Sequence, residues 1–112
     1  MNLKDGRKGP GVWAQLQKVS TKPERGAELL DVFDQLKAIE QPDSGLLRTM
    51  VMRSPAEPTQ VYVLVVFESQ EKARAREQDP RRQQGLERIR AAMGDLLDGP
   101  PEFFDLEVVR DE

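Results

Sequence analysis

Two observations predict a single α+β domain, in which one antiparallel sheet carries helices on one face, and a third excludes several chemistries. The apolar runs follow the order strand, helix, strand, strand, helix, strand, which is the βαββαβ order of ferredoxin-like folds. The chain has 112 residues, the size of one domain. It contains no histidine and no cysteine. Because many unrelated functions share this element order, it predicts a fold and not a reaction.

The N-terminal part of the chain divides into a tail and a first strand. Residues 1–11 combine glycine, proline and basic residues and offer little to bury, so we expect a flexible tail followed by one domain over residues 12–112. Val12 to Val19 predicts a strand with period-two alternation. Its two faces differ: Val12, Ala14 and Leu16 share one, and Trp13, Gln15 and Gln17 share the other.

The first helix is predicted from a start signal and an apolar stripe. Pro23 and Glu24 follow Ser20 and Thr21, which is typical of a helix N-terminus, and we expect the helix to run to about Glu40. Helical spacing places one group of apolar residues on a stripe that should pack on the sheet. The stripe consists of Leu29, Val32, Phe33, Leu36 and Ile39.

The second and third strands follow a breaker cluster at residues 42–45. Leu46 to Arg53 predicts the second strand, and Gln60 to Glu68 predicts the third. Every residue from Val61 to Phe67 is apolar or aromatic, so this strand should be central and covered on both faces.

The second crossover is predicted to have two helical parts. Ser69 can cap a first part that ends near Gln78, and Asp79 with Pro80 resembles a fresh N-cap that restarts the helix. The charged run at residues 71–77 is expected to be a solvated helix face, supported by a pair between Glu77 and Arg81. Apolar residues Leu86, Ile89, Met93, Leu96 and Leu97 fall on one side of the second part, and the last strand is expected over Phe103 to Arg110.

The predicted sheet has one face that a single chain cannot cover. Right-handed crossovers place both helices on the same face of the sheet. The central strand is nevertheless apolar on both faces, and Phe103 and Phe104 point to opposite sides. Because a monomer of this size rarely exposes such a patch, we expect a homodimer through the open sheet face, forming a barrel from both sheets.

Composition excludes several chemistries and partners. The formal charge of −3 argues against nucleic acid as a partner, and no apolar run approaches the length of a membrane span, so we expect a cytoplasmic protein. Without cysteine or histidine, thiolate nucleophiles, imidazole bases and the commonest transition-metal ligands are absent. We therefore expect no metal site and no cofactor. Any catalysis must use carboxylates, Tyr62, lysine, arginine or the substrate itself.

The segment V-Y-V-L-V-V-F-E-S-Q-E and the long two-part second crossover resemble the dimeric α+β-barrel superfamily. Within it, the sequence Phe67-Glu68-Ser69 after the third strand and the turn from Pro42 to Gly45 resemble the antibiotic biosynthesis monooxygenase (ABM) domain. Members of that family include cofactor-independent oxygenases of aromatic polyketides and haem-degrading enzymes that use a helix-borne histidine. Many relatives carry a histidine in the second crossover, where this chain has Asp79-Pro80-Arg81-Arg82.

The resemblance implies a cofactor-independent monooxygenase-like protein that acts on or binds a small aromatic, polyketide-type molecule. For catalytic roles we select an acid or base and donors for developing negative charge, namely Tyr62, Glu68 and Arg48. Substrate contacts are expected from aromatic and soft apolar side chains, namely Trp13, Met50, Met52 and Phe33.

Two other interpretations remain open. Each selected residue also has a structural explanation, since a strand tryptophan is more often packing than ligand contact. The chain would then be a non-catalytic dimer that binds a small molecule or assists an enzyme. An RNA-binding RRM shares the element order, with Trp13 and Tyr62 as stacking platforms. The negative charge and the long second crossover argue against it.

Overall fold

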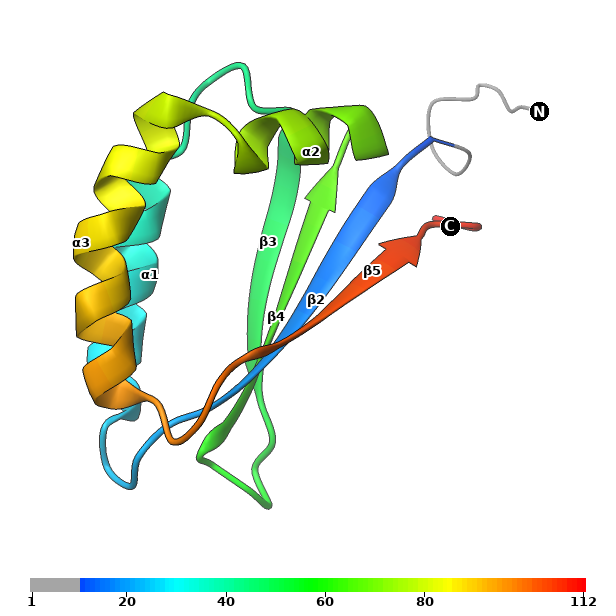
Figure 1. Cartoon of the computed structure of the whole chain (residues 1–112). Helices are drawn as coiled ribbons and strands as arrows, with labels where there is room; N and C mark the ends of the chain where they lie inside the picture. The colour runs from blue at the N-terminus through cyan, green and yellow to red at the C-terminus, as the bar shows by residue number, and fades with distance from the viewer. Residues whose placement is uncertain (1–10) are drawn as a thin grey trace.

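A computed structural model describes residues 11–112 and confirms the α+β, ferredoxin-like βαββαβ architecture. The predicted tail lies almost entirely outside the described residues. In chain order the elements are β2 (Trp13–Ser20), α1 (Gly26–Ala38), β3 (Leu46–Arg53), β4 (Gln60–Phe67), α2 (Gln70–Glu77), α3 (Pro80–Leu96) and β5 (Glu102–Glu107). Figure 1 shows the sheet on one side, with α1 and α3 on the other and α2 across the end between them.

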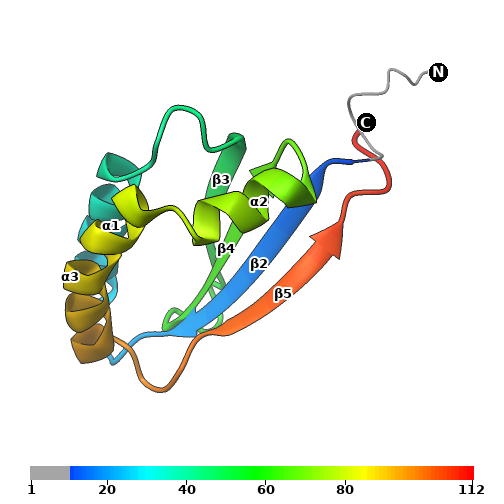
Figure 2. The same ribbon diagram turned by 45° about the horizontal axis from the view of Figure 1, so that its top comes forward.

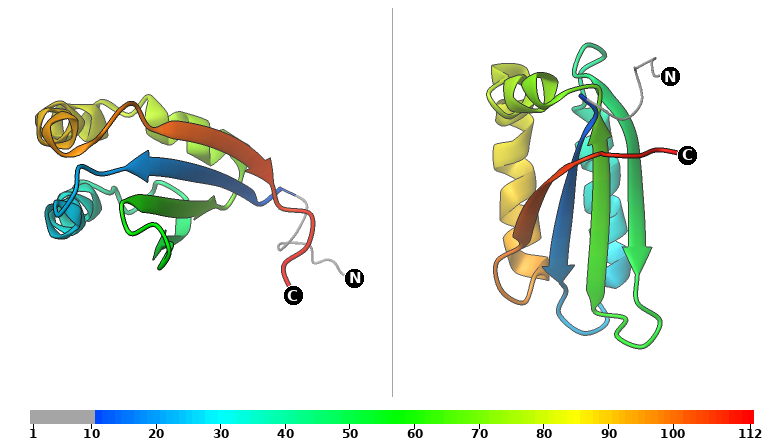
Figure 3. Two further views of the ribbon diagram at one scale, coloured as in Figure 1. Left: turned by 90° about the horizontal axis from the view of Figure 1, so that it is seen from below. Right: turned by 90° about the vertical axis from the view of Figure 1, so that its right-hand side faces the viewer.

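The four strands form one antiparallel sheet in the order β3-β4-β2-β5. Consecutive strands β3 and β4 form a hairpin, whereas β2 lies between β4 and β5. All three helices lie on one face of this sheet, as the end-on and side views show (Figure 3). This arrangement is the one predicted for right-handed crossovers.

Strand β4 is buried on the helix-covered face only. Val61, Val63, Val65 and Phe67 point toward the helices and are each at most 6% exposed. Their alternates, including Tyr62 and Leu64, are only half-buried on the opposite, open face. In a single chain, one of the two faces of this strand is therefore buried as predicted, and the other is not.

The first helix begins later than its start signal predicts. Thr21 forms a β-bridge with Leu97, and the amide of Lys22 donates a hydrogen bond to Leu96 O at 2.9 Å. These contacts extend the strand-like backbone past Ser20. Pro23 then lies in a turn and Glu24 takes a φ of 65°, so the helix begins at Gly26. A tertiary contact between the end of β2 and the end of α3 has overridden a local signal.

The two-part second crossover is confirmed, and both predicted caps form. The Ser69 hydroxyl accepts a hydrogen bond from the amide of Lys72, and the Asp79 carboxylate accepts one from the amide of Arg81. Pro80 occupies the first turn of α3, where it is well tolerated. Figure 2 shows the resulting change of direction, with α2 lying across the strands and α3 beside α1. Strand β5 ends at Glu107, three residues before the predicted end at Arg110.

The core joins the helix-covered face of the sheet to the two long helices. Leu29 and Val32 of the predicted stripe are buried, as are Ile89, Leu96 and Leu97 of the second crossover. Phe33, Leu36 and Met93 pack against this cluster but remain partly accessible. Within residues 11–112, no helix combines the length and apolar composition that a membrane span requires.

Candidate functional site

Two neighbouring cavities lie between the sheet and the helices. The larger, about 880 Å³, is lined by residues of β2, α2, α3 and β5. The smaller, about 490 Å³, is lined by residues of β2, α1, β3 and β4 and by one arginine each from α2 and α3. Gln17, Leu36, Arg76 and Arg82 line both cavities. The larger cavity has the size of a small-molecule site.

Helices α1 and α3 pack closely on each other beside these cavities. Gly85 of α3 lies against Ile39 at the end of α1, so near that an added Cβ would stand 2.6 Å from the Ile39 Cγ2. Glycine at this position lets the two helices approach each other. They meet as a pair beside the sheet, and α2 spans the interval at one end (Figure 1).

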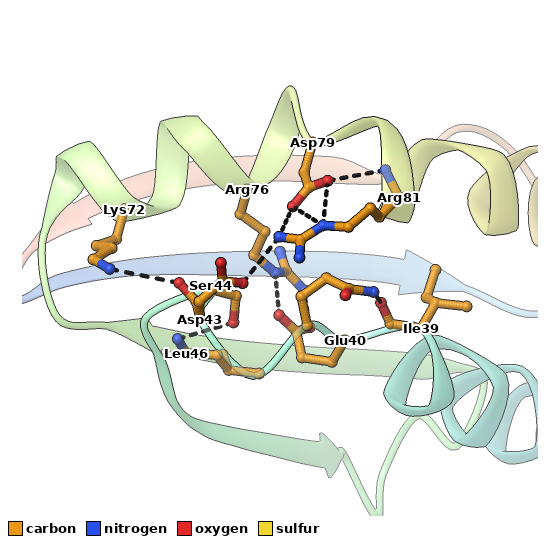
Figure 4. Close-up of polar contacts among 10 residues, drawn as sticks. Ile39, Glu40, Asp43, Ser44, Leu46, Lys72, Arg76, Asp79 and Arg81 are labelled. Atoms are coloured by element: carbon orange, nitrogen blue, oxygen red, sulfur yellow. Dashed lines mark hydrogen bonds and ion pairs between the residues drawn. The ribbon is translucent and has the colours of Figure 1, made fainter.

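An ion pair ties α2 to the end of α1 at the boundary between the cavities. Arg76 donates from Nε and Nη2 to the two carboxylate oxygens of Glu40 at 2.9 and 2.8 Å (Figure 4). The two side chains are only 13% and 16% exposed. The Arg76 guanidinium also stacks over the Phe67 ring, 5.1 Å from its centroid.

The pKa of Glu40 depends on both its burial and its arginine partners. Burial acts to raise the pKa, but hydrogen bonds from Arg76 and Ser44 and the charges of Arg76 and Arg82 outweigh it. The pKa therefore lies below its ordinary value, and the Glu40 carboxylate remains ionised at neutral pH.

A second network closes the cavity between α2 and β5. Arg74 donates to Asp105 at 2.8 Å and lies 3.4 Å from a Glu77 carboxylate oxygen. Gln15 donates to both carboxylates, at 3.2 and 3.0 Å. The hydrogen bond from Arg74 holds the pKa of Asp105 below its ordinary value. Neither carboxylate is therefore free of a cationic partner.

The expectation that residues 71–77 form a solvated helix face holds for Glu71, Lys72 and Glu77, which are exposed, but not for Arg76, which is largely buried. Arg74 and Arg76 line the cavities, and Glu77 pairs with Arg74 and not with Arg81. Arg81 instead bonds Asp79 and Asp43, which joins the start of α3 to the turn after α1 (Figure 4). The charge run looks like a solvated face in sequence because its partners Glu40 and Asp105 are remote along the chain.

The seven residues selected from sequence lie on two faces of the sheet. By register, Tyr62, Met50, Met52 and Arg48 share the open face. Arg48 is also among the residues that line the smaller cavity, together with Phe33. Glu68 is exposed just beyond β4. The structure therefore brings together the four open-face residues and separates them from most of the cavity lining.

Trp13 lies on the helix-covered face, where Arg74 stacks over its ring at 5.7 Å from the centroid. Its Nε1 is buried and has no hydrogen-bond partner among residues 11–112. Trp13 does not line either cavity described above. Over the same residues, no group of three or more acidic side chains is placed to hold a metal ion.

Sequence reasoning missed the arginines that line the larger cavity: Arg74, Arg76, Arg82 and Arg90. One usable signal was present, since Arg82, Leu86, Arg90 and Met93 fall on one face of a helix. In this chain that mixed apolar and basic stripe lines the larger cavity.

Comparison with known proteins gives the same fold and a family. Among solved structures, the chain is similar to a candidate ABM protein from Caulobacter crescentus, with 24% identity and a TM-score of 0.73 over 90% of this chain and 92% of that one. It is also similar to a mutant of SnoaB, a cofactor-independent oxygenase from Streptomyces nogalater, with 15% identity and a TM-score of 0.72 over 90% and 96%. A conserved protein from Methanosarcina mazei matches with 14% identity and a TM-score of 0.72 over 88% and 93%.

No curated protein sequence matches the chain significantly. The family model for antibiotic biosynthesis monooxygenase matches residues 14–88, which span β2 to the middle of α3. This match covers more than half of the chain, and the structure supplies the fold that the matched segment requires. The chain therefore belongs to the antibiotic biosynthesis monooxygenase family.

Proposed function

We propose that this protein is a cofactor-independent monooxygenase that binds a small aromatic molecule in the cavity between the sheet and the helices. The observation that carries the proposal is the lining of the larger cavity. Apolar side chains, including Leu86, Met93 and Phe103, share it with a group of arginines. Family membership supports an oxygenase-like or ligand-binding role.

This lining suits a reaction in which the substrate carries its own electrons to oxygen. An anthrone loses a proton from its methylene carbon to water, which leaves a delocalised anion. The anion transfers one electron to O₂, and the resulting radical pair combines to form a peroxide. Loss of water then leaves the quinone, with one oxygen atom in the product and the other in water.

The protein's contribution would be electrostatic. Positive side chains near an anion that develops during reaction lower the barrier more in a partly water-excluded site than in water. Arg76 and Arg82 lie where the two cavities meet, and both face that shared space. Their charges would favour the deprotonated substrate without requiring an imidazole base.

We also propose that two copies pair through the open sheet face. Apolar side chains on that face remain accessible in the single chain, among them Met52, Phe104 and Leu106 at 40–44% exposure. A two-fold pair of sheets would cover them and form the predicted barrel. The larger cavity is lined from the other face and would remain accessible in such a dimer.

The alternative function is a non-catalytic dimer that binds a small molecule. The same cavity supports it, because binding needs only the lining and not a reacting group. Oxygen uptake with dithranol, a dihydroxyanthrone, separates the two functions. An oxygenase should raise the rate above the uncatalysed reaction in proportion to protein concentration, whereas a binding protein should leave that rate unchanged.

Two matched variants test which face carries the site. Phe103 lines the larger cavity, and Tyr62 lies on the open face. If the substrate occupies the helix-covered side, Phe103→Leu should reduce dithranol turnover several-fold, and Tyr62→Phe should leave it near wild type. The reverse result would move the site to the open face and support the catalytic role predicted for Tyr62, Arg48 and their neighbours.

A further inference from the structure

The larger cavity carries positive charge that the described residues do not neutralise. Its lining contains four arginines and two acids, Glu77 and Asp105, and both acids are bonded to Arg74. Arg76 is paired with Glu40. Arg82 and Arg90 form no hydrogen bond or ion pair with any side chain in residues 11–112. This excess stands out in a chain whose formal charge is −3.

Arg82 is the more enclosed of the two unpaired arginines. It is half-buried, lines both cavities and lies in the first turn of α3, whereas Arg90 is exposed. Burial, followed by repulsion from Arg76, lowers the pKa of Arg82 to about 10, and the opposing attraction of the Glu40 and Glu77 carboxylates does not outweigh these two effects. A lowered pKa means that the surroundings of Arg82 disfavour its positive charge. The side chain nevertheless carries that charge at neutral pH. A bound anion would relieve that cost.

The position of Arg82 adds to this preference. The N-terminal turn of a helix carries a partial positive charge, which favours anions nearby. Arg76 approaches from α2 on the other side, so two guanidinium groups flank the space where the cavities meet.

The rest of the cavity fits an apolar body. Leu86 and Met93 follow Arg82 along the same face of α3, and Phe103 of β5 lies across the cavity. Arg90 is about 12 Å along the helix axis from Arg82, so one small anionic group cannot bridge both. A ligand with its charge at Arg82 would extend its apolar part toward Met93 and Phe103.

We propose that this cavity selects a small aromatic carboxylate, with the carboxylate bound by Arg82 and the ring system lying against Leu86, Met93 and Phe103. The inference rests on the proposed function in placing the ligand in the same cavity, and it adds a ligand class with a fixed negative charge. Arginine suits this role because its planar fork can donate two parallel hydrogen bonds to a carboxylate.

Isothermal titration with naphthoate and with its neutral analogue naphthamide tests the inference, since the two probes differ mainly in charge. The wild type should bind naphthoate at least tenfold more tightly than naphthamide. Arg82→Gln should abolish this preference and leave naphthamide binding unchanged. Arg81→Gln is the matched control, because Arg81 is the adjacent residue, carries the same charge and bonds Asp79 and Asp43 outside the cavity.

Three results would overturn the inference: equal binding of the two probes by the wild type, no binding of either probe at millimolar concentration, or a preference that survives Arg82→Gln. Circular dichroism verifies that each variant is folded. If Arg82→Gln does not fold, Arg82→Lys replaces it, and retained preference with weaker naphthoate binding supports the assignment. If Arg82→Lys binds naphthoate as tightly as the wild type, the assignment of the carboxylate to Arg82 is overturned.

The readout is independent of catalysis. A tenfold preference for naphthoate without any oxygen uptake would reject the oxygenase function and keep the anion site. Oxygen uptake with dithranol but no preference between the probes would keep the oxygenase function and reject the anion site.

Discussion

The two faces of the sheet are built from the same strands but hold opposite kinds of side chain. The helix-covered face combines a buried apolar row with cavities lined by charged groups, and the Arg76–Glu40 pair lies at their boundary. The open face is mostly apolar around Leu64, with Lys18 beside Tyr62 and Arg48 at one end. Of the β3 residues that pair with β4 on this face, Arg48 alone lines a cavity. Charged side chains therefore gather where the helices leave space, and apolar side chains gather where a second sheet can cover them.

Disrupting the open face should give the largest effect. Leu64→Asp places a charge in the middle of the proposed dimer interface, where its desolvation would be uncompensated. We expect complete conversion from a particle of twice 12.7 kDa to one of 12.7 kDa. Light scattering at micromolar concentration measures this change.

Leu30→Asp provides the control for that experiment. Leu30 is 55% exposed on α1, away from the open face, so the same chemical change there should leave the dimer intact. A wild-type monomer, or a Leu64→Asp protein that stays dimeric, would refute the proposed interface.

Breaking the ion pair on the helix-covered face should give an intermediate effect. Glu40→Gln keeps the shape of the side chain but leaves Arg76 half-buried without its anionic partner. We expect the free energy of unfolding to fall by about 2–3 kcal/mol in urea titration. Asp43→Asn is the matched control, because the Asp43–Arg81 pair is 67% and 53% exposed and should contribute less than about 0.5 kcal/mol. Equal losses in both variants would contradict the distinction between buried and exposed pairs.

The pH dependence of the same pair should give the smallest effect. A pKa of Glu40 that is lower in the folded chain than in the unfolded chain contributes stability above the unfolded value, about 4.3, and that contribution is lost as pH falls through the folded value. The stability difference between wild type and Glu40→Gln should therefore narrow as the pH falls below about 4. Urea titrations at several pH values measure it, and a difference that widens on acidification would reverse the assigned sign.

The elements and the sheet faces were predictable because they depend on local patterns. The spacing along β4 and the caps at Ser69 and Asp79 each act within a few residues, and all three are present in the structure. The start of α1 was misplaced because Thr21 bonds to the end of α3, a contact that no local signal reports.

The candidate site was less predictable, because it depends on distant pairs. The positions of Arg74 and Arg76 make sense only with Asp105 and Glu40, which lie on other elements. Side-chain chemistry favours residues such as Tyr62 and Phe33, but it does not indicate which face of the sheet carries a cavity. Their roles stay predictions.

The central place of β2 has a consequence for the time course of folding. The β3–β4 hairpin pairs neighbouring segments, whereas β2 pairs Trp13 with both Phe67 and Glu107. Because closing longer loops costs more chain entropy, the hairpin can nucleate early and the β2–β5 pairing should form last. Phe103 and Asp105 of β5 line the larger cavity. The cavity is therefore completed only in the final step of folding. A ligand that contacts this strand would bind the finished fold and not its precursors, and would act mainly by slowing unfolding.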